Sequence, residues 1–455
     1  MPKKKSFDRV RRKTGRATRR MAGNLYSKAS ERVKRFTKQT DEILSEQSID
    51  FSAPSIPYYE NLANRMSFVR VVLYMALLVF VVVTVVCNHR LITYENLYYL
   101  AKDIGAATLT AQSRADQVSY PISSTAPDFA LYRGGMVVAG SEVVTAVSGS
   151  GRQTLSVNVA YAEPCVRTSE KYYVTFGRGE RSFAVYNSFV QVHREITEFP
   201  VYEAAVGNNG NFAIVTRSRD YTSEVVIYDG DMEKLANYHL NGYVTGISMN
   251  EEGDRLGVVS VESKGGVWET KITLIRIGSR INHQSATLTG SFGSVCGFVA
   301  DDRFAVVSSD RLMIWDGDAT VKGETRLDGM ALTHCAIAEG RIALLSERED
   351  DLSERSLQVF DKNGRSVYRL ALNKNHPITR DGETLELAFG GETLYARTPH
   401  RLFRLSEDGD ELTFAQISRD TLMILPVDGD EVFICTPAYA ARMEKQDFET
   451  MEGAS

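Results

Sequence analysis

The stretch VYEAAVGNNGNFAIVTRS (201–218) decides the fold, because its pattern recurs along the chain. It consists of a short apolar run, a polar turn and a second apolar run. GYVTGISMNEEGDRLGVVSV (242–261) has the same order, and so do the stretches at 292–309, 329–347 and 420–437. Short runs rich in Val, Ile, Tyr and Phe, bounded by Gly, Asp and Asn, are typical of strands. Each stretch therefore predicts an antiparallel hairpin.

A second hairpin often follows the first one. Examples are VVIYDGDMEKLANY (225–238) and RLMIWDGDATVKGETRL (311–327), so the repeating unit has four strands. One residue in each inner-hairpin turn marks eight units, at a mean spacing of 42 residues: Gly134, Glu170, Asn209, Glu252, Asp301, Glu339, Gly390 and Asp428. A period of about 40–45 residues with four strands per unit is typical of a β-propeller.

The predicted fold class is all-β: an eight-bladed propeller of four-stranded blades over residues 115–447. Seven blades is the alternative, because the spacing of the units is irregular, and a two-sheet sandwich is a further one. The last unit supplies three strands between 420 and 443. QVSYPI (117–122) would supply the fourth strand of that blade and close the ring. Residues 448–455 are expected to form a polar C-terminal tail.

An apolar segment precedes the repeats. VVLYMALLVFVVVTVVC (71–87) holds 17 residues without a charge. Since about 20 helical residues cross a hydrocarbon core of about 30 Å, we expect a transmembrane helix over 65–90. A cleaved signal peptide would have a short basic region before the apolar run, but here 70 residues precede it. The segment is therefore predicted to remain as a single uncleaved span, and 91–114 as a short juxtamembrane helix.

The charge distribution predicts the orientation of this span. Residues 1–70 carry 17 Lys and Arg against 7 Asp and Glu, a net charge of +10, and the remaining residues carry 36 against 51, a net charge of -15. Basic residues concentrate on the cytoplasmic side of a span. The N-terminus is therefore expected in the cytoplasm and the propeller on the far side of the membrane.

The tail, residues 1–64, combines an amphipathic helical pattern with a linker to the span. Apolar residues recur from Leu25 to Leu44 in steps of three, four or seven. Basic side chains fill much of the remaining face and are candidates for contact with anionic lipid: Lys28, Arg32, Lys34, Arg35 and Lys38. The alternative is a solvated tail that only sets the topology. Nucleic-acid binding is not expected, because the tail has no interleaved aromatic residues.

The sequence contains no recognisable catalytic, cofactor or metal motif. Asp-Gly-Asp occurs at 229–231, 316–318, 408–410 and 428–430, where the repeat requires turns, and we interpret it as a turn signal rather than a calcium loop. The seven histidines are isolated, with no HExxH, and no GxSxG is present. The five cysteines form no CxxC pair, which favours buried thiols over a disulfide framework. We therefore predict no catalytic residue, no cofactor and no metal ligand.

The order of segments resembles a known family. YENLYYLAKDI (94–104) and EPCVRTSEKYYVTFGRGERSFAVYNSF (163–189), followed by the repeats from 201, resemble a bacterial family of membrane-anchored β-propellers of unknown function. That family is similar to the quinoprotein-like and WD40-like propeller superfamily. The resemblance implies fold and topology but no activity. WD40 itself fits poorly, because Trp315-Asp316 is the one WD dipeptide.

Function is then inferred from geometry and charge. A propeller presents two rims of loops, which suits a protein-interaction or scaffold module of the bacterial cell envelope, held at the cytoplasmic membrane by its span. A net charge of -15 after residue 70 favours basic partners or cations over nucleic acid. The alternative is a ligand sensor or an enzyme, such as a glycan hydrolase or lyase, with a site in the central channel. Transmembrane signalling through the tail is a third hypothesis.

Overall fold

The structure is a computed structural model that describes residues 66–67, 69–80, 116–123, 125–188, 190–278, 281–327, 329–348, 355–381 and 383–450. The chain divides into two units, Met1–Asn96 and Leu97–Ser455. In the first unit, residues 66–67 and 69–80 are helical and exposed. Within the described residues, no helix has both the length and the apolar character needed to cross a membrane. The basic tail and the expected helix at 91–114 lie outside the described residues.

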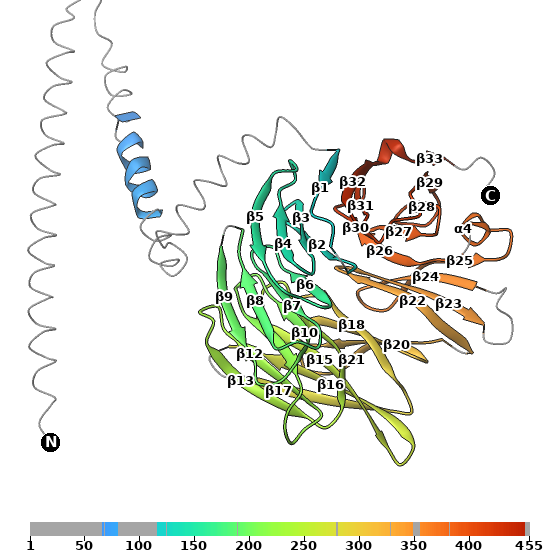
Figure 1. The fold of residues 1–455 in the computed structure, drawn as a ribbon, viewed down its shortest axis with the longest axis horizontal. Coiled ribbons are helices and arrows are strands. Elements are labelled where there is room, and N and C mark those ends of the chain that lie inside the picture. Colours follow the sequence, from blue (N-terminus) through green and yellow to red (C-terminus); the bar gives the residue numbers. More distant parts are fainter. Residues whose placement is uncertain are drawn as a thin grey trace, which may run out of the picture. The chain divides into compact units, whose positions relative to one another are not determined.

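The second unit is a ring of eight antiparallel sheets (Figure 1). The first four blades, in chain order, are β2 (Asp128–Tyr132), β3 (Gly135–Ala139), β4 (Val143–Val147) and β5 (Gln153–Asn158); β6 (Pro164–Thr168), β7 (Tyr173–Gly177), β8 (Ser182–Tyr186) and β9 (Gln191–Ile196); β10 (Val201–Val206), β11 (Phe212–Thr216), β12 (Ser223–Tyr228) and β13 (Lys234–Leu240); and β14 (Tyr243–Met249), β15 (Arg255–Lys264), β16 (Val267–Arg276) and β17 (Asn282–Thr289).

The remaining blades repeat this order. Their strands are β18 (Gly293–Ala300), β19 (Arg303–Ser308), β20 (Arg311–Asp316) and β21 (Val321–Arg326); β22 (Met330–Ala338), β23 (Arg341–Arg348), β24 (Arg355–Asp361) and β25 (Ser366–Leu372); β26 (Glu386–Gly390), β27 (Thr393–Arg397), β28 (Arg401–Leu405) and β29 (Leu412–Gln416); and β30 (Met423–Pro426), β31 (Glu431–Cys435) and β32 (Tyr439–Glu444). A short helix, α4 (Pro377–Arg380), joins blades 6 and 7.

The N-terminal strand closes the ring. β1 (Gln117–Ser119) pairs antiparallel with β32, with Gln117 opposite Ala441, and completes blade 8. Val118 and Tyr120 are buried against blade 1. The predicted eight blades and the predicted closing strand are confirmed, and the alternatives of seven blades and a sandwich are wrong.

The C-terminal residues add an element that the sequence did not predict. After the 3-10 turn η1 (Lys445–Asp447), β33 (Glu449–Thr450) pairs with β29 as a fifth strand of blade 7. Phe448 is buried between blades 7 and 8, with its ring 6.1 Å from that of Tyr395. Residues 448–450 therefore belong to the propeller rather than to a polar tail.

The core lies between the blades. Side chains on alternate residues of a strand point to opposite faces of the sheet, so the two middle strands of each blade pack against both neighbouring blades. Between blades 2 and 3, for example, Phe183 and Phe212 lie edge to face, and Phe212 stacks on Tyr228 at 4.4 Å. The outer strands alternate exposed and half-buried residues, as in β9 and β21. Every blade is thereby covered on both faces, which a single isolated blade could not achieve.

Candidate functional site

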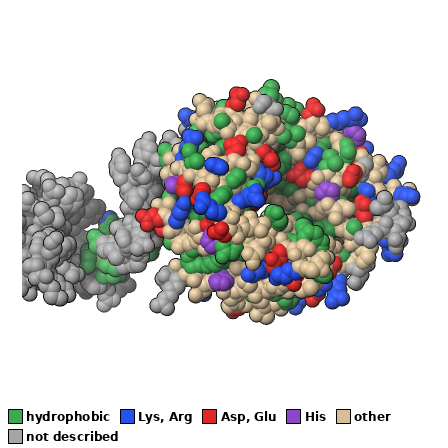
Figure 2. Space-filling model, turned by 60° about the horizontal axis from the view of Figure 1, so that its bottom comes forward, with side chains coloured by type: hydrophobic (Ala, Val, Ile, Leu, Met, Phe, Trp, Pro, Cys, Tyr) green, Lys and Arg blue, Asp and Glu red, His purple; other side chains and the backbone are tan. Residues whose placement is uncertain are grey.

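The eight inner-hairpin turns lie at one end of the ring, which we call the turn rim. Because every inner strand runs in the same direction, all eight residues expected in these turns lie at this end, at or beside the connection between the first two strands of a blade. Figure 2 shows a hollow at the centre of the ring, with acidic and basic side chains around it. The chemistry of the channel therefore depends on what the turns place at its mouth.

A cavity of about 270 Å³ opens among these turns. It is lined by residues of five consecutive blades, 2 to 6, which places it at the central channel. Val206, Met249 and Phe298 give it apolar surface. Four carboxylates from blades 2, 4, 5 and 6 also line it, and we call this set the acidic mouth: Glu170, Glu251, Asp301 and Glu339.

Asn208 connects three of the turns. Its Oδ1 accepts the backbone N–H of Glu170 at 2.7 Å, and its Nδ2 donates to Glu251 Oε1 at 3.3 Å. Its own backbone N–H donates to the Glu251 carbonyl at 2.9 Å. The buried Asn250 holds the Glu251 turn from within, because its Oδ1 accepts the N–H of Arg255 at 2.9 Å. Two of the four carboxylate residues, Glu170 and Glu251, are thus held by hydrogen bonds between neighbouring turns.

The carboxylates of the mouth influence one another electrostatically. Partial burial raises the pKa of Glu251 above its usual value, and the negative charges of Glu170, Glu339 and Asp301 raise it further. The Asn208 amide opposes this shift without cancelling it. The mouth therefore has negative potential that no described basic side chain of the cavity wall neutralises. A cation placed among these carboxylates would relieve their repulsion.

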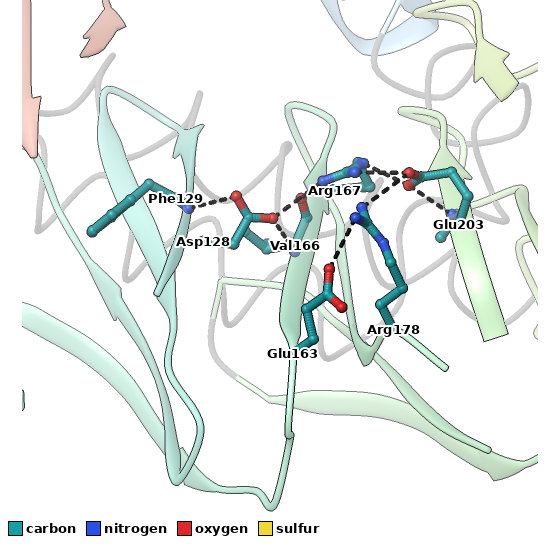
Figure 3. A network of polar contacts seen from close by, with 8 residues as sticks. Asp128, Phe129, Glu163, Val166, Arg167, Arg178 and Glu203 are labelled. Carbon is teal, nitrogen blue, oxygen red and sulfur yellow. Dashed lines mark hydrogen bonds and ion pairs between the residues drawn. The ribbon is translucent and has the colours of Figure 1, made fainter. Parts of the chain in front are cut away.

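A second set of charges lies on and beside the inner strands of blades 1 to 3, and here each charge has a partner (Figure 3). Asp128 Oδ2 accepts the backbone N–H of Val166 at 2.9 Å and lies 3.2 Å from Arg167 Nη1. Arg167 Nε lies 2.7 Å from Glu203 Oε1. Arg178 lies between Glu203, at 3.6 Å, and Glu163, at 3.0 Å.

Burial alone would lower the pKa of Arg167, but Glu203 and Asp128 outweigh it and raise that pKa. The network therefore joins three blades through ion pairs, in which two guanidinium groups contact three carboxylates. It is a structural clasp, since its members satisfy one another.

The Asp-Gly-Asp motifs lie in turns, as predicted. Asp229 Oδ1 accepts the backbone N–H groups of Asp231 at 3.0 Å and Glu233 at 2.8 Å, and Asp316 repeats this pattern. In the turn at 229–231 the positive φ falls on Met232, whereas at 408–410 it falls on Gly409. A Cβ on Gly230 would lie 2.6 Å from the carbonyl oxygen of Asn209, so this glycine permits close approach of two turns.

The other predicted features are placed as follows. Within the described residues, no group of three or more His, Cys, Asp or Glu could hold a metal ion. Four described cysteines are free, and burial raises the pKa of Cys165 to about 11. His193 lies 3.4 Å from Glu195, a pair that the sequence analysis missed although the two residues share one face of β9. The tail residues proposed for lipid contact, Lys28, Arg32, Lys34, Arg35 and Lys38, lie outside the described residues.

Comparison with known proteins identifies a family whose function is unknown. The model of DUF5711, a family of unknown function, matches residues 110–444. The chain belongs to this family. The DUF5711 match covers the whole ring, so the expected membership of a propeller family of unknown function is confirmed, while bacterial origin and membrane anchoring remain predictions. No curated protein matches the sequence.

Several solved structures are similar to this DUF5711 chain at low identity and with TM-scores below 0.5. Dihydro-heme d1 dehydrogenase NirN, in complex with DHE, is 10% identical with a TM-score of 0.49, covering 75% of this chain and 78% of that one. Apo AztD from Citrobacter koseri is 12% identical with a TM-score of 0.44, covering 66% and 86%. The Pan2 WD40 domain from Neurospora crassa is 8% identical with a TM-score of 0.42, covering 72% and 95%. Such similarity concerns the fold alone.

Proposed function

We propose that this chain is a membrane-anchored protein-interaction module of the bacterial cell envelope, whose acidic mouth receives a basic segment of a partner protein. The observation that carries the proposal is the cavity of about 270 Å³, whose lining combines four carboxylates with the apolar side chains of Val206, Met249 and Phe298. A Lys or Arg side chain has the matching properties, because its aliphatic stem packs on apolar surface while its charge meets the carboxylates.

The composition of the acidic mouth favours recognition of a partner over catalysis. A glycosidase-type site needs one carboxylic acid and one carboxylate held at a defined separation across the scissile bond. Here four carboxylates, each from a different blade, line one cavity. Charge complementarity to a basic partner accounts for all four, whereas a two-carboxylate mechanism accounts for two.

The membrane anchor belongs to the same proposal. It is supported by the uncharged run 71–87 and by the excess of Lys and Arg before it. Within the first unit, the helical residues 69–80 leave apolar side chains such as Leu73 and Phe80 exposed. A topology reporter fused at the C-terminus, compared with one fused at the N-terminus, tests the orientation. A cytoplasmic signal from the C-terminal fusion would contradict the export of the propeller.

The mouth is tested by charge removal with a matched control. The test variant carries Glu170→Gln, Glu251→Gln, Asp301→Asn and Glu339→Gln, and the control variant carries Asp231→Asn and Glu233→Gln in an outer turn of blade 3. Full-length chains are crosslinked in intact cells, and captured partners are identified by mass spectrometry. In parallel, binding of a fluorescent oligoarginine peptide is titrated at two salt concentrations.

We expect the test variant to lose the recurrent partner and at least tenfold of the peptide affinity, with a weaker salt dependence, because four charges contribute to the binding potential. The control variant should keep both. Equal peptide affinity in the two variants would contradict the proposal.

One observation favours the second candidate function, an enzyme or ligand sensor in the channel. The raised pKa of Glu251 beside three other carboxylates is the environment of a general acid. The Glu251→Gln substitution alone discriminates between the two functions. An enzyme would lose turnover of a glycan substrate completely, whereas a four-carboxylate binding mouth would lose only part of its affinity for a basic peptide.

A further inference from the structure

A second cavity, of about 60 Å³, lies between blades 4 and 5 near the turn rim. Blade 4 contributes the start of β15 and the end of β16, and blade 5 contributes β18, β19 and the turn after β20. Of the described residues, only Phe298 lines both this cavity and the acidic mouth. A water-sized group needs about 10–15 Å³, so the cavity has room for a ligand group of a few non-hydrogen atoms.

Part of the cavity wall is apolar and belongs to the core. Leu274 of blade 4 and Phe298 and Phe304 of blade 5 line the cavity and are members of the cluster between the two blades. A Cβ on Gly257, which pairs with Leu274, would overlap the Phe304 ring. This glycine therefore lets the ring pack directly on β15, and the apolar wall is held by core packing.

Two arginines line the same cavity, and neither has an acceptor within hydrogen-bond distance. Arg255 and Arg276 are opposite each other in the pairing of β15 with β16, so their side chains leave the same face of the sheet. Within the described residues, Arg255 has one ion pair, in which its Nε lies 3.9 Å from Asp254 Oδ1, and Arg276 has none. Like charges directly opposite each other destabilise a sheet. An anion bound between the two guanidinium groups would relieve this repulsion.

The carboxylates of the cavity lining do not supply that anion. Asp316 Oδ2 lies 2.8 Å from Lys322 Nζ, and its Oδ1 accepts two backbone N–H groups. Asp302 Oδ2 lies 2.5 Å from Arg303 Nη1. Asp318, the third carboxylate, is exposed and forms no ion pair with either arginine of the cavity. The two arginines are therefore available to a carboxylate from outside the chain.

We propose that this cavity binds a carboxylate that carries a short apolar side group. The arginines would hold the carboxylate, because the N–H donors of a guanidinium group form a planar fork that matches its two oxygens. The apolar group would contact Leu274, Phe298 and Phe304. Two sources supply this chemistry, namely a free small acid and the C-terminal residue of a peptide.

Gly317 allows Arg255 to reach across the interface between the blades. A Cβ on Gly317, in the turn after β20, would overlap Arg255 Nη1, so the guanidinium group of blade 4 lies directly against a turn of blade 5. The φ of Gly317 is not positive, and the overlap involves the end of a flexible side chain. Gly317→Ala should therefore displace the guanidinium group without unfolding the blade.

Trp315 provides an optical signal for the cavity. It pairs with Phe304 across β19 and β20 and belongs to the same cluster as the apolar wall. It is 4% exposed, and its Nε1 has no hydrogen-bond partner within the described residues. The chain has one other tryptophan, Trp268, which is 51% exposed. In a Trp268→Phe chain, tryptophan emission therefore comes from Trp315 alone.

The first test titrates the full-length Trp268→Phe chain in detergent with three probes at constant ionic strength. N-acetyl-leucine has both the carboxylate and the apolar group, N-acetyl-leucinamide lacks the carboxylate, and N-acetylglycine lacks the apolar group. We expect N-acetyl-leucine to change the Trp315 emission saturably, with a dissociation constant of about 1 mM, and the other two probes to bind at least tenfold more weakly. Saturation-transfer NMR should show that the leucine methyl groups contact the protein.

Variants then test the named residues. Arg255→Gln combined with Arg276→Gln should weaken the binding of N-acetyl-leucine at least tenfold, and Gly317→Ala should weaken it in the same direction. The matched control carries Arg152→Gln and Arg365→Gln, which remove two exposed arginines from other turns of the same rim. It should bind within about twofold of the parent chain. Thermal melts check that each variant is folded.

The second test distinguishes the two sources of the carboxylate. A labelled Arg-Arg-Arg-Gly-Leu peptide is compared with its C-terminally amidated form. Tighter binding of the free form supports a site for peptide C-termini, and equal binding of the two forms beside binding of N-acetyl-leucine supports a site for free acids.

The proposal would be overturned by equal responses to N-acetyl-leucine and its amide, by no response in either fluorescence or NMR, or by unchanged binding in the double arginine variant. The inference does not use the acidic mouth. The four-carboxylate variant should therefore still bind N-acetyl-leucine, and failure of one proposal leaves the other measurable.

Discussion

Removal of the Phe448 side chain tests whether the C-terminal segment belongs to the propeller. Phe448 is 9% exposed and contacts the cluster between blades 7 and 8 that includes Tyr395 and Val432. The segment before it is shaped by η1, in which the Glu444 N–H is accepted by Asp447 Oδ2 at 2.8 Å. The residues after it form β33. Phe448→Ala does not prevent the formation of η1 or β33, but it removes the buried side chain that holds both against the ring.

The expected cost follows from burial and cavity formation. Truncation of a buried Phe to Ala costs about 3–5 kcal/mol, which includes the lost transfer free energy and the cavity that remains. Because Phe448 lies at the edge of its cluster, neighbouring side chains can partly fill the space, so we take the lower end, about 3 kcal/mol. For a domain of this length, that corresponds to a fall in melting temperature of about 5 °C.

The assay is thermal unfolding followed by circular dichroism, with Tyr243→Ala as the matched control. Tyr243 is also aromatic but is 69% exposed, so its truncation should change the free energy of unfolding by less than about 0.5 kcal/mol. If Phe448→Ala changes stability as little as Tyr243→Ala does, the C-terminal segment is not part of the folded ring.

Three further predictions concern buried and titrating groups. Glu431→Gln should destabilise the chain by about 3–5 kcal/mol in urea unfolding, because Glu431 and Arg442 form an ion pair whose side chains are only 7% and 6% exposed, and loss of one partner strands the other charge. Acid should unfold the propeller. Burial opposes the shift, but Lys322 and backbone N–H groups lower the pKa of Asp316, and backbone N–H groups do the same for Asp361. The stability that these carboxylates provide is therefore fully present above their ordinary pKa and is lost as pH falls through the folded values, which a pH series of thermal melts will show. Cys165 should resist a thiol reagent at pH 8 in the native state and react on unfolding, because burial raises its pKa to about 11.

The ring was predictable because its determinants are local and repeated. The inner hairpins at 201–218 and 242–261 carry the same alternation of apolar runs and polar turns, and counting such turns led to eight blades. The closing strand was also predictable, because the last unit lacked one strand and QVSYPI (117–122) had the required pattern. Phe448 was missed because it stands alone in a polar segment. Its burial depends on a crevice between two blades, which no local pattern reveals.

The acidic mouth could be predicted only in part. Glu170, Asp301 and Glu339 each served as a marker of an inner turn, so the recurrence of carboxylates at this position was visible in the sequence. What the sequence could not show is their convergence around one cavity, since that depends on how five blades are arranged about the axis. The role of Asn208 in joining three turns was invisible for the same reason.

The contrast between the charges of the clasp and those of the acidic mouth indicates the end of the ring at which a partner would bind. In the clasp, Arg167 and Arg178 compensate Asp128, Glu203 and Glu163, so these groups have little to gain from a ligand. At the turn rim, Glu251 accepts a hydrogen bond from the Asn208 amide, and partial burial together with the charges of Glu170, Glu339 and Asp301 raises its pKa. A basic partner can stabilise carboxylates that have no basic group beside them. The cavity wall at the acidic mouth contains no described basic side chain. A basic partner would therefore be expected to enter the channel from the turn rim, and neutralisation of the clasp should affect stability before it affects binding.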